Sequence, residues 1–182
     1  QSLIQLMESV YVDLNFEEEA GHPDNRGWMN LFRHWSGSGM MRVAWSLSCQ
    51  TYGARFQSFA RRELDLSNAD GMDFDESFVP NDVERRRFES ERAARPSMKA
   101  SRLVGIYVLV DSAIGGKQFR FRVGLMAVTR IRPDKKGEPD IEIFHWMRIQ
   151  NQLRSMGLGT LAIDAYDRRL AAQGVRLAKD SS

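Results

Sequence analysis

Residues 152–161 read QLRSMGLGTL and stand between a predicted strand and a predicted helix. Glycine lets a backbone approach a phosphate closely, and the first N–H groups of a helix have no partners within the helix. The helix dipole also favours a negative group at this end. Arg154 can add a charge-assisted hydrogen bond, and Thr160 can add a hydroxyl. With Gly157 and Gly159 at the helix start, the pattern predicts a cradle for an anion; a tight turn without any ligand is the alternative.

The segments on both sides of this loop have the patterns of regular elements. Residues 141–149 form a run typical of a strand. A helix is predicted over residues 157–173, and Gly174 ends it. Residues 175–178 are then expected to start another strand.

Two further strands are predicted upstream. Residues 103–110 are a β-branched run, and residues 119–129 form a second strand pattern. Residues 113–117 and 133–137 carry glycine, proline and lysine, which are typical of turns. Three strands joined by short turns predict an antiparallel meander that ends at residue 149.

The spacing Arg-x-x-Gly-x-Gly at a strand-to-helix junction resembles motif A of the GNAT acetyltransferases, with Arg154, Gly157 and Gly159 in the three defining positions. The resemblance covers the C-terminal half, residues 101–182. It implies an α+β fold with a GNAT-like antiparallel or mixed sheet and an N-terminal helical region. In that fold the strand at 141–149 splays from the next strand and leads into the loop that holds coenzyme A.

The resemblance implies an acyl-CoA-dependent N-acyltransferase that uses acetyl-CoA or another acyl-CoA. The acceptor would be a small-molecule or protein amine that the sequence does not identify. The residues that the resemblance assigns to the cofactor are Met147, Ile149, Gln152, Arg154, Met156, Gly157, Leu158, Gly159 and Thr160.

Two residues on the same strand are candidates for catalysis. In the family, a backbone N–H of the splayed strand often meets the oxyanion, and a carboxylate on that strand often serves as the base. Glu142 is the nearest match for the base. His145, on the opposite face by strand alternation, is the second candidate, because histidine changes charge near neutral pH. An ion-paired Glu142 and a hydrogen-bonded sheet histidine at His145 are the structural alternatives.

The sequence departs from the family in three places. The family continues beyond its fifth strand with another helix and two strands that often carry a tyrosine acid, whereas this sequence stops at Ser182. A proline that often precedes the loop is Asn151 here, and the first 100 residues match nothing in the family. These departures leave open that the GNAT-like region is truncated. They also keep a second function open: a catalytically degenerate module that docks a protein partner through its aromatic N-terminal helices.

Residues 1–64 are predicted to form a helical region. Trp28, Phe32 and Trp35 recur at helical spacing, and a single helix is predicted over about residues 40–63. This region carries an aromatic stripe that fits a core and is a candidate wall for an acyl cavity: Trp28, Trp35, Trp45, Tyr52, Phe56 and Phe59.

Residues 65–100 are polar and are predicted to be a linker with one exposed helix at about 81–94, ended by Pro96. Its acidic residues do not have the spacing of a calcium loop. The arginines that follow are interleaved with glutamates, which favours a solvated helix over a nucleic-acid surface.

Composition sets the remaining expectations. The chain has 182 residues, 42% of them hydrophobic, and a formal charge of +2, which does not by itself indicate nucleic acid. Cys49 is the single cysteine, so an internal disulfide is excluded and a reducing, cytoplasmic location is expected. The sequence contains no metal-ligand spacing and no apolar run long enough to span a bilayer. A homodimer or a protein partner is compatible with this composition.

Overall fold

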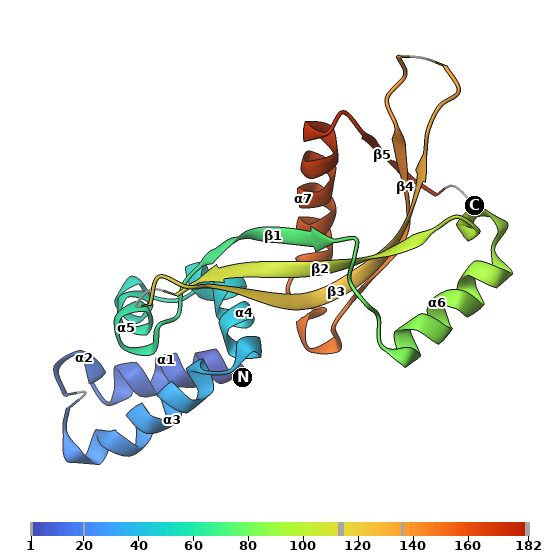
Figure 1. Ribbon diagram of the computed structural model, residues 1–182. Coiled ribbons are helices and arrows are strands. Elements are labelled where there is room, and N and C mark those ends of the chain that lie inside the picture. Colours follow the sequence, from blue (N-terminus) through green and yellow to red (C-terminus); the bar gives the residue numbers. More distant parts are fainter. Residues whose placement is uncertain (1, 20, 113–114, 136, 181–182) are drawn as a thin grey trace. The chain divides into compact units, whose positions relative to one another are not determined.

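The computed structural model describes residues 2–19, 21–112, 115–135 and 137–180. It has an α+β fold, as predicted, with one five-stranded sheet in the order β1-β2-β3-β4-β5 (Figure 1). The strands are β1 (Ala69–Asp75), β2 (Arg102–Asp111), β3 (Gln118–Ile131), β4 (Ile141–Ile149) and β5 (Arg176–Lys179). The chain divides into two compact units, residues 1–71 with 108–121 and residues 72–107 with 122–182.

The first unit is built around helices with an aromatic core. Its helices are α1 (Leu3–Asp13), α2 (Phe16–Glu19), α3 (Arg26–Ser36), α4 (Gly39–Ser48) and α5 (Ala54–Leu64), with short 3-10 turns η1 (Pro23–Asn25) and η2 (Cys49–Thr51). Phe32, Trp45, Phe56 and Phe59 are buried in one hydrophobic cluster. Much of the aromatic stripe is therefore the core of this unit.

The single helix predicted over residues 40–63 is wrong, because the chain forms α4 and α5 with a break between them. The break falls at η2 and at Gly53, which caps α5 in an extended conformation. The backbone N–H of Gly53 donates to the carboxylate of Glu8 at 2.8 Å. This contact from α1 gives that N–H a partner outside the helix, which periodicity alone does not predict.

Asp65 joins the helices of the first unit to the end of β2. It ends α5 in a left-handed conformation with φ 53°, and its carbonyl accepts a hydrogen bond from Arg42 Nη1 at 2.6 Å. Its carboxylate accepts a hydrogen bond from Ser112 Oγ at 2.9 Å. A second contact joins the same two segments: the side chain of Gln118, at the start of β3, donates to the Asp70 carboxylate at 2.8 Å. Residues 108–121 are thus part of the helical unit, although more than thirty-five residues separate them from residue 71 in the sequence.

The second unit contains α6 (Asp82–Ala94), α7 (Leu158–Ala172) and the 3-10 turns η3 (Pro96–Met98) and η4 (Asn151–Leu153). The predicted helix at 81–94 is confirmed as α6, which starts with a capping box between Asn81 and Glu84. Phe88 of α6 packs in a cluster with Leu103 and Leu125. Helix α7 contacts β4 and β5.

The predicted strands and the C-terminal helix agree with the structure, apart from one strand that the sequence did not indicate. β1 lies inside the segment predicted to be a polar linker. Only Phe74 is buried in this strand, so its acidic sequence lacks the apolar alternation that indicates strands. The turns predicted at 113–117 and 133–137 include residues 113, 114 and 136, which lie outside the described residues. No helix in the described part of the chain is long and apolar enough to cross a membrane.

Candidate functional site

The two halves of β4 have different neighbours. β4 pairs antiparallel with β3 along its whole length, from Ile141 to Ile149. It pairs parallel with β5 only from Ile141 to Phe144, and the last contact is the N–H of Asp180 donating to the Phe144 carbonyl at 3.0 Å. Among the described residues, 145–149 therefore have no strand partner on the β5 side. The parallel pairing thus stops at Phe144, beside the end of the described part of the chain at residue 180.

The bare edge presents the backbone groups of two residues. The N–H of Gln150 donates to the carbonyl of Val123 at 2.9 Å, so this residue faces β3. Backbone groups alternate along an antiparallel strand, so Arg148 also faces β3, whereas Met147 and Ile149 turn their N–H and C=O groups to the bare edge. Both are residues that the family resemblance assigned to the cofactor.

A β-bulge separates the two halves of β4. Ala127 of β3 pairs with Trp146 and the next residue, Val128, pairs with Phe144, so His145 is an extra residue in the ladder. The His145 ring is hydrogen-bonded at both nitrogens. Nδ1 lies 2.7 Å from Asp180 Oδ2, and Nε2 lies 2.8 Å from Thr129 Oγ1.

The loop after β4 ends in a left-handed glycine. Gly157 has φ 71° and forms the N-cap of α7, which makes no side-chain capping hydrogen bond. The first backbone bond of the helix runs from the N–H of Leu161 to the Gly157 carbonyl at 3.3 Å, so the N–H groups of residues 158–160 have no helical partner. A Cβ atom added at Gly159 would meet nothing within 4 Å. The first turn of α7 therefore opens onto free space.

The structure places the other predicted cofactor residues around this turn. Arg154, Thr160 and Gln152 are exposed, and Met156 is partly buried. The side chain of Leu158 is buried in the protein, so only its backbone N–H is left to serve an anion site. The predicted loop residues thus lie at one strand-to-helix junction, whereas Glu142 and His145 lie in or before the bulge.

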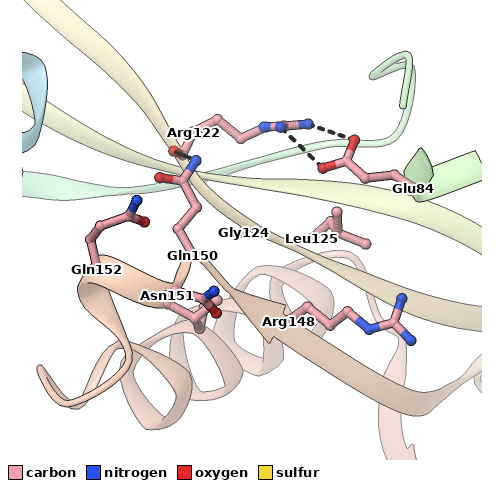
Figure 2. Close-up of a pocket in the computed structure, with 9 residues that line it drawn as sticks. Glu84, Arg122, Gly124, Leu125, Arg148, Gln150, Asn151 and Gln152 are labelled. Atoms are coloured by element: carbon pink, nitrogen blue, oxygen red, sulfur yellow. Dashed lines mark hydrogen bonds and ion pairs between the residues drawn. The ribbon is translucent and has the colours of Figure 1, made fainter. Parts of the chain in front are cut away.

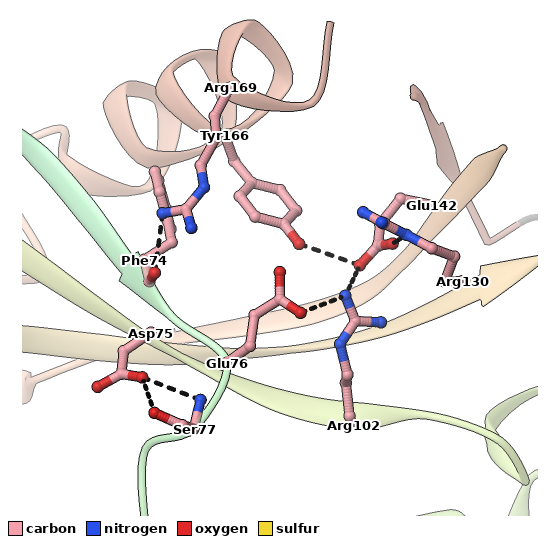
Figure 3. Close-up of polar contacts among 9 residues, drawn as sticks. All are labelled: Phe74, Asp75, Glu76, Ser77, Arg102, Arg130, Glu142, Tyr166 and Arg169. Atoms are coloured by element: carbon pink, nitrogen blue, oxygen red, sulfur yellow. Dashed lines mark hydrogen bonds and ion pairs between the residues drawn. The ribbon is translucent and has the colours of Figure 1, made fainter. Parts of the chain in front are cut away.

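Glu142 is fully buried in a network of charged and polar groups (Figure 3). Its carboxylate accepts hydrogen bonds from Arg102 Nη2 at 2.6 Å, Arg130 Nε at 2.8 Å and the Tyr166 hydroxyl at 3.0 Å. Arg102 also pairs with Glu76 at 3.2 Å. The network joins β2, β3, β4 and α7 at one carboxylate.

The network changes the acid–base properties of its members. Burial, with the nearby negative charge of Glu142 as the second cause, raises the pKa of the Tyr166 hydroxyl above its usual value. The hydrogen bond to Glu142 raises the pKa of the Arg130 guanidinium. Both shifts keep the protons of Tyr166 and Arg130 in place beside Glu142.

A cavity of about 260 Å³ lies beside the end of β4 (Figure 2). Ile149 and Gln152 line it, together with a carboxylate from α6, Glu84, and a guanidinium from β3, Arg122. Arg122 holds Glu84 by two contacts of 3.1 Å, and the Gln150 side chain donates to the Arg122 carbonyl at 2.9 Å. The wall of this cavity is therefore polar and held in place by hydrogen bonds.

Sequence reasoning missed the groups that surround both Glu142 and this cavity. Arg130 is the direct cross-strand neighbour of Glu142, a pairing that can be recognised only once the strand register is known. Gly124 gives a signal that was available, since a glycine inside a strand often marks a close approach of backbones. A Cβ there would lie 2.5 Å from the Arg148 carbonyl oxygen.

Comparison with protein-family models and with curated proteins finds no match. Comparison with solved structures finds partial likenesses. An acetyltransferase of Trypanosoma brucei is 16% identical, with a TM-score of 0.33, over 59% of this chain and 68% of its own. A transcriptional regulator from Bacillus halodurans is 14% identical, with a TM-score of 0.34, over 60% of this chain and 83% of its own. At these TM-scores neither likeness carries an argument about function.

Proposed function

We propose that this protein binds an acyl-CoA at the β4–α7 junction and transfers the acyl group to an amine. The observation that carries the proposal is the combination of a bare strand edge at Met147 and Ile149 with an open first helical turn after Gly157. A strand edge offers amide partners to a pantetheine arm, and the turn offers unpaired N–H groups to a pyrophosphate. The pantetheine arm and the pyrophosphate of coenzyme A would thus both find hydrogen-bonding partners at this junction.

The residues would divide the binding as follows. The N–H groups of residues 158–160 and the Arg154 guanidinium bind phosphate oxygens, since such contacts combine hydrogen bonding with charge. The backbone groups of Met147 and Ile149 bind the amides of the arm. Gln152, Met156 and Thr160 border the same turn and complete the contact surface.

A bound acyl-CoA supplies an acyl group activated as a thioester. Transfer forms a bond from the amine nitrogen to the acyl carbon and breaks the bond from that carbon to sulfur, while the amine loses one proton and the departing thiolate gains one. The N–H of Met147 or Ile149 donates to the carbonyl oxygen as negative charge develops there. The polar cavity beside Ile149 is the proposed place for the acceptor.

His145 is the better of the two candidate bases. Both side chains are almost fully buried, but Asp180, which bonds His145, keeps 16% of its side chain exposed and so connects the ring to solvent. Glu142 is enclosed by Arg102, Arg130 and Tyr166, whose hydrogen bonds occupy both oxygens of its carboxylate. We therefore assign Glu142 a role in holding the sheet, and His145 the role of proton acceptor.

Calorimetric titration of acetyl-CoA and free CoA tests the binding site. Wild-type protein should bind both in the micromolar range. Gly159→Glu places a carboxylate where phosphate is expected and should weaken binding at least about tenfold. Gly27→Glu is the matched control, because Gly27 is also the second residue of a helix, with nothing within 4 Å of its Cβ position. Absence of heat with either ligand would refute the proposal.

Arg154 is tested in the same titration. Arg154→Ala should weaken binding about tenfold through the loss of one charge-assisted contact. Arg168→Ala, which removes an exposed arginine later in α7, should leave the affinity unchanged. Equal effects of the two variants would show that overall charge, and not the loop, determines affinity.

Burial of both candidate bases favours a second function, an acyl-CoA-binding module without transfer activity. This function predicts micromolar acetyl-CoA binding with no acylated product from a panel of primary amines at pH 7 to 9. Product formation that His145→Ala abolishes would exclude it.

A further inference from the structure

The first unit contains a cavity of about 710 Å³ between α4, α5 and the segment that follows α5. Cavities of this size hold small organic molecules. Trp45 and Leu66 are buried and line it, together with Ala54 at the start of α5. The Trp45 ring is fixed by stacking on Tyr52 at a centroid distance of 5.8 Å. The floor of the cavity is therefore a packed aromatic layer, in which Trp45 is only 2% exposed.

The polar part of the cavity is cationic. Arg61 and Arg62 of α5 line it, and none of its lining residues is acidic. Arg62 bonds Glu63 at 3.0 Å, whereas Arg61 has no hydrogen-bond or ion-pair partner among the described residues. Arg55 of the same helix is also paired, with Glu17. Arg61 is thus the arginine of α5 whose charge is left unneutralised, and it faces the cavity.

A second donor at the cavity is held in a fixed orientation. The side-chain oxygen of Asn68 accepts a hydrogen bond from the thiol of Cys49 at 3.1 Å. Asn68 lines the cavity, and this contact leaves its amide nitrogen without a partner in the described part of the chain. An amide N–H and a guanidinium, with no carboxylate among the lining residues, favour a negative ligand group.

We propose that this cavity is a binding site for a small organic anion with a flat apolar body, of the class of aromatic carboxylates. The carboxylate binds Arg61 and the Asn68 amide, and the apolar body lies along α5 over the exposed Ala54 and Ser58. The site belongs to the first unit and is independent of acyl-CoA binding, so neither proposal depends on the other.

The first experiment titrates 1-naphthoate and the neutral 1-naphthamide, which have the same ring and nearly the same size, into the whole protein by calorimetry. 1-Naphthoate should bind with a submillimolar dissociation constant, and 1-naphthamide should bind about tenfold more weakly. Equal affinities would overturn the assignment of an anion site. No binding of 1-naphthoate up to about 10 mM would overturn the site altogether.

Variants of α5 locate the bound anion. Arg61→Gln should weaken 1-naphthoate binding about tenfold, whereas Arg55→Gln, which removes an equal charge from the same helix outside the cavity, should change it less than about twofold. Ser58→Trp fills the cavity from the exposed face of α5 and should abolish binding, while circular dichroism verifies the fold. Unchanged binding in Arg61→Gln or Ser58→Trp would place the ligand elsewhere and refute the proposal.

Discussion

The two halves of β4 differ in their strand pairing and in their roles. Residues 141–144 are paired on both sides and contain Glu142, whose buried carboxylate has three donors. Within the part of the chain that the structure describes, residues 145–149 are paired with β3 alone and leave Met147 and Ile149 with bare backbone groups. One strand thus combines a stabilising half with a half that is available to a ligand, and the bulge at His145 separates them.

This difference shows how the fold keeps a bare strand edge in place. An edge with free N–H and C=O groups invites other strands, and it must also stay in position if it is to bind a ligand. The ionic network around Glu142 holds the first half to β2, β3 and α7. The second half then needs only its ladder with β3 to remain in position.

The largest expected effect is a loss of stability, and it comes from residues 141–144, the half of β4 that is paired on both sides. Glu142→Leu leaves Arg102 and Arg130 without their buried carboxylate, and we expect a loss of about 3–5 kcal/mol in the free energy of unfolding. Urea unfolding at pH 7 measures it. Glu76→Leu is the control, because it removes from the same Arg102 a carboxylate whose side chain is 44% exposed, and it should cost less than about 1 kcal/mol. Similar losses in the two variants would contradict a stabilising network centred on Glu142.

The next effect tests how firmly β3 holds the bare half. Gly124→Ala adds a Cβ that would lie 2.5 Å from the Arg148 carbonyl oxygen, a backbone atom that cannot rotate away. We expect a loss of about 1–3 kcal/mol in unfolding free energy. Gly71→Ala, at a strand position with nothing within 4 Å, should stay within about 0.5 kcal/mol of wild type. An unchanged stability of Gly124→Ala would mean that β3 and β4 separate here at little cost.

A smaller loss of stability is expected when Tyr166 is changed, and its dependence on pH identifies the cause. Tyr166→Phe removes one donor to Glu142 and should cost about 1 kcal/mol at pH 7. The raised pKa of Tyr166 means that the folded protein holds the phenolic proton more tightly than the unfolded chain does. The associated stability is complete below the unfolded pKa of about 10 and is lost as pH rises above it.

Wild-type protein should therefore lose stability more steeply than Tyr166→Phe above about pH 10. Thermal unfolding at a series of pH values measures the two slopes. Tyr52→Phe is the control, since the Tyr52 hydroxyl makes no hydrogen bond among the described residues, and it should keep the wild-type slope. Parallel curves for wild type and Tyr166→Phe would rule out this linkage.

The smallest expected effect is on the hydrogen exchange of single amides, and it involves no change in the stability of the protein. The N–H groups of Met147 and Ile149 should exchange with solvent deuterium at least about tenfold faster than that of Arg148, which faces β3. Nuclear magnetic resonance of the exchanging protein resolves these neighbours. Acetyl-CoA should slow Met147 and Ile149 selectively. Equal protection of the three amides in the free protein would show that the edge is not bare in solution.

Much of the second unit could be predicted from the sequence because its signals are local. The strand at 141–149 was predicted with its observed limits, and the helix after Gly157 to within one residue at each end. Apolar strand runs and helix-bounding glycines need no knowledge of distant residues. β1 was missed for the converse reason, since it is an acidic strand in which only Phe74 is buried.

The site was less predictable because its geometry depends on distant partners. Glu142 could be selected as a carboxylate on the correct strand, but the arginines that enclose it lie 40 and 12 positions earlier in the chain. The bulge at His145 depends on the pairing with β3, for which the sequence carries no local mark. The catalytic base therefore remains a proposal, whereas the glycine loop lies between a strand and a helix, as predicted.

The contact between Asp65 and Ser112 affects how the protein is made. Residues 108–121 belong to the helical unit, so a ribosome that has just completed α5 has not yet produced the whole unit. At about 5–20 residues per second, the next fifty residues take several seconds to emerge. During that interval the Asp65 carboxylate lacks the Ser112 hydroxyl, so the hydrogen bond between these two segments forms only after β2 has left the ribosome.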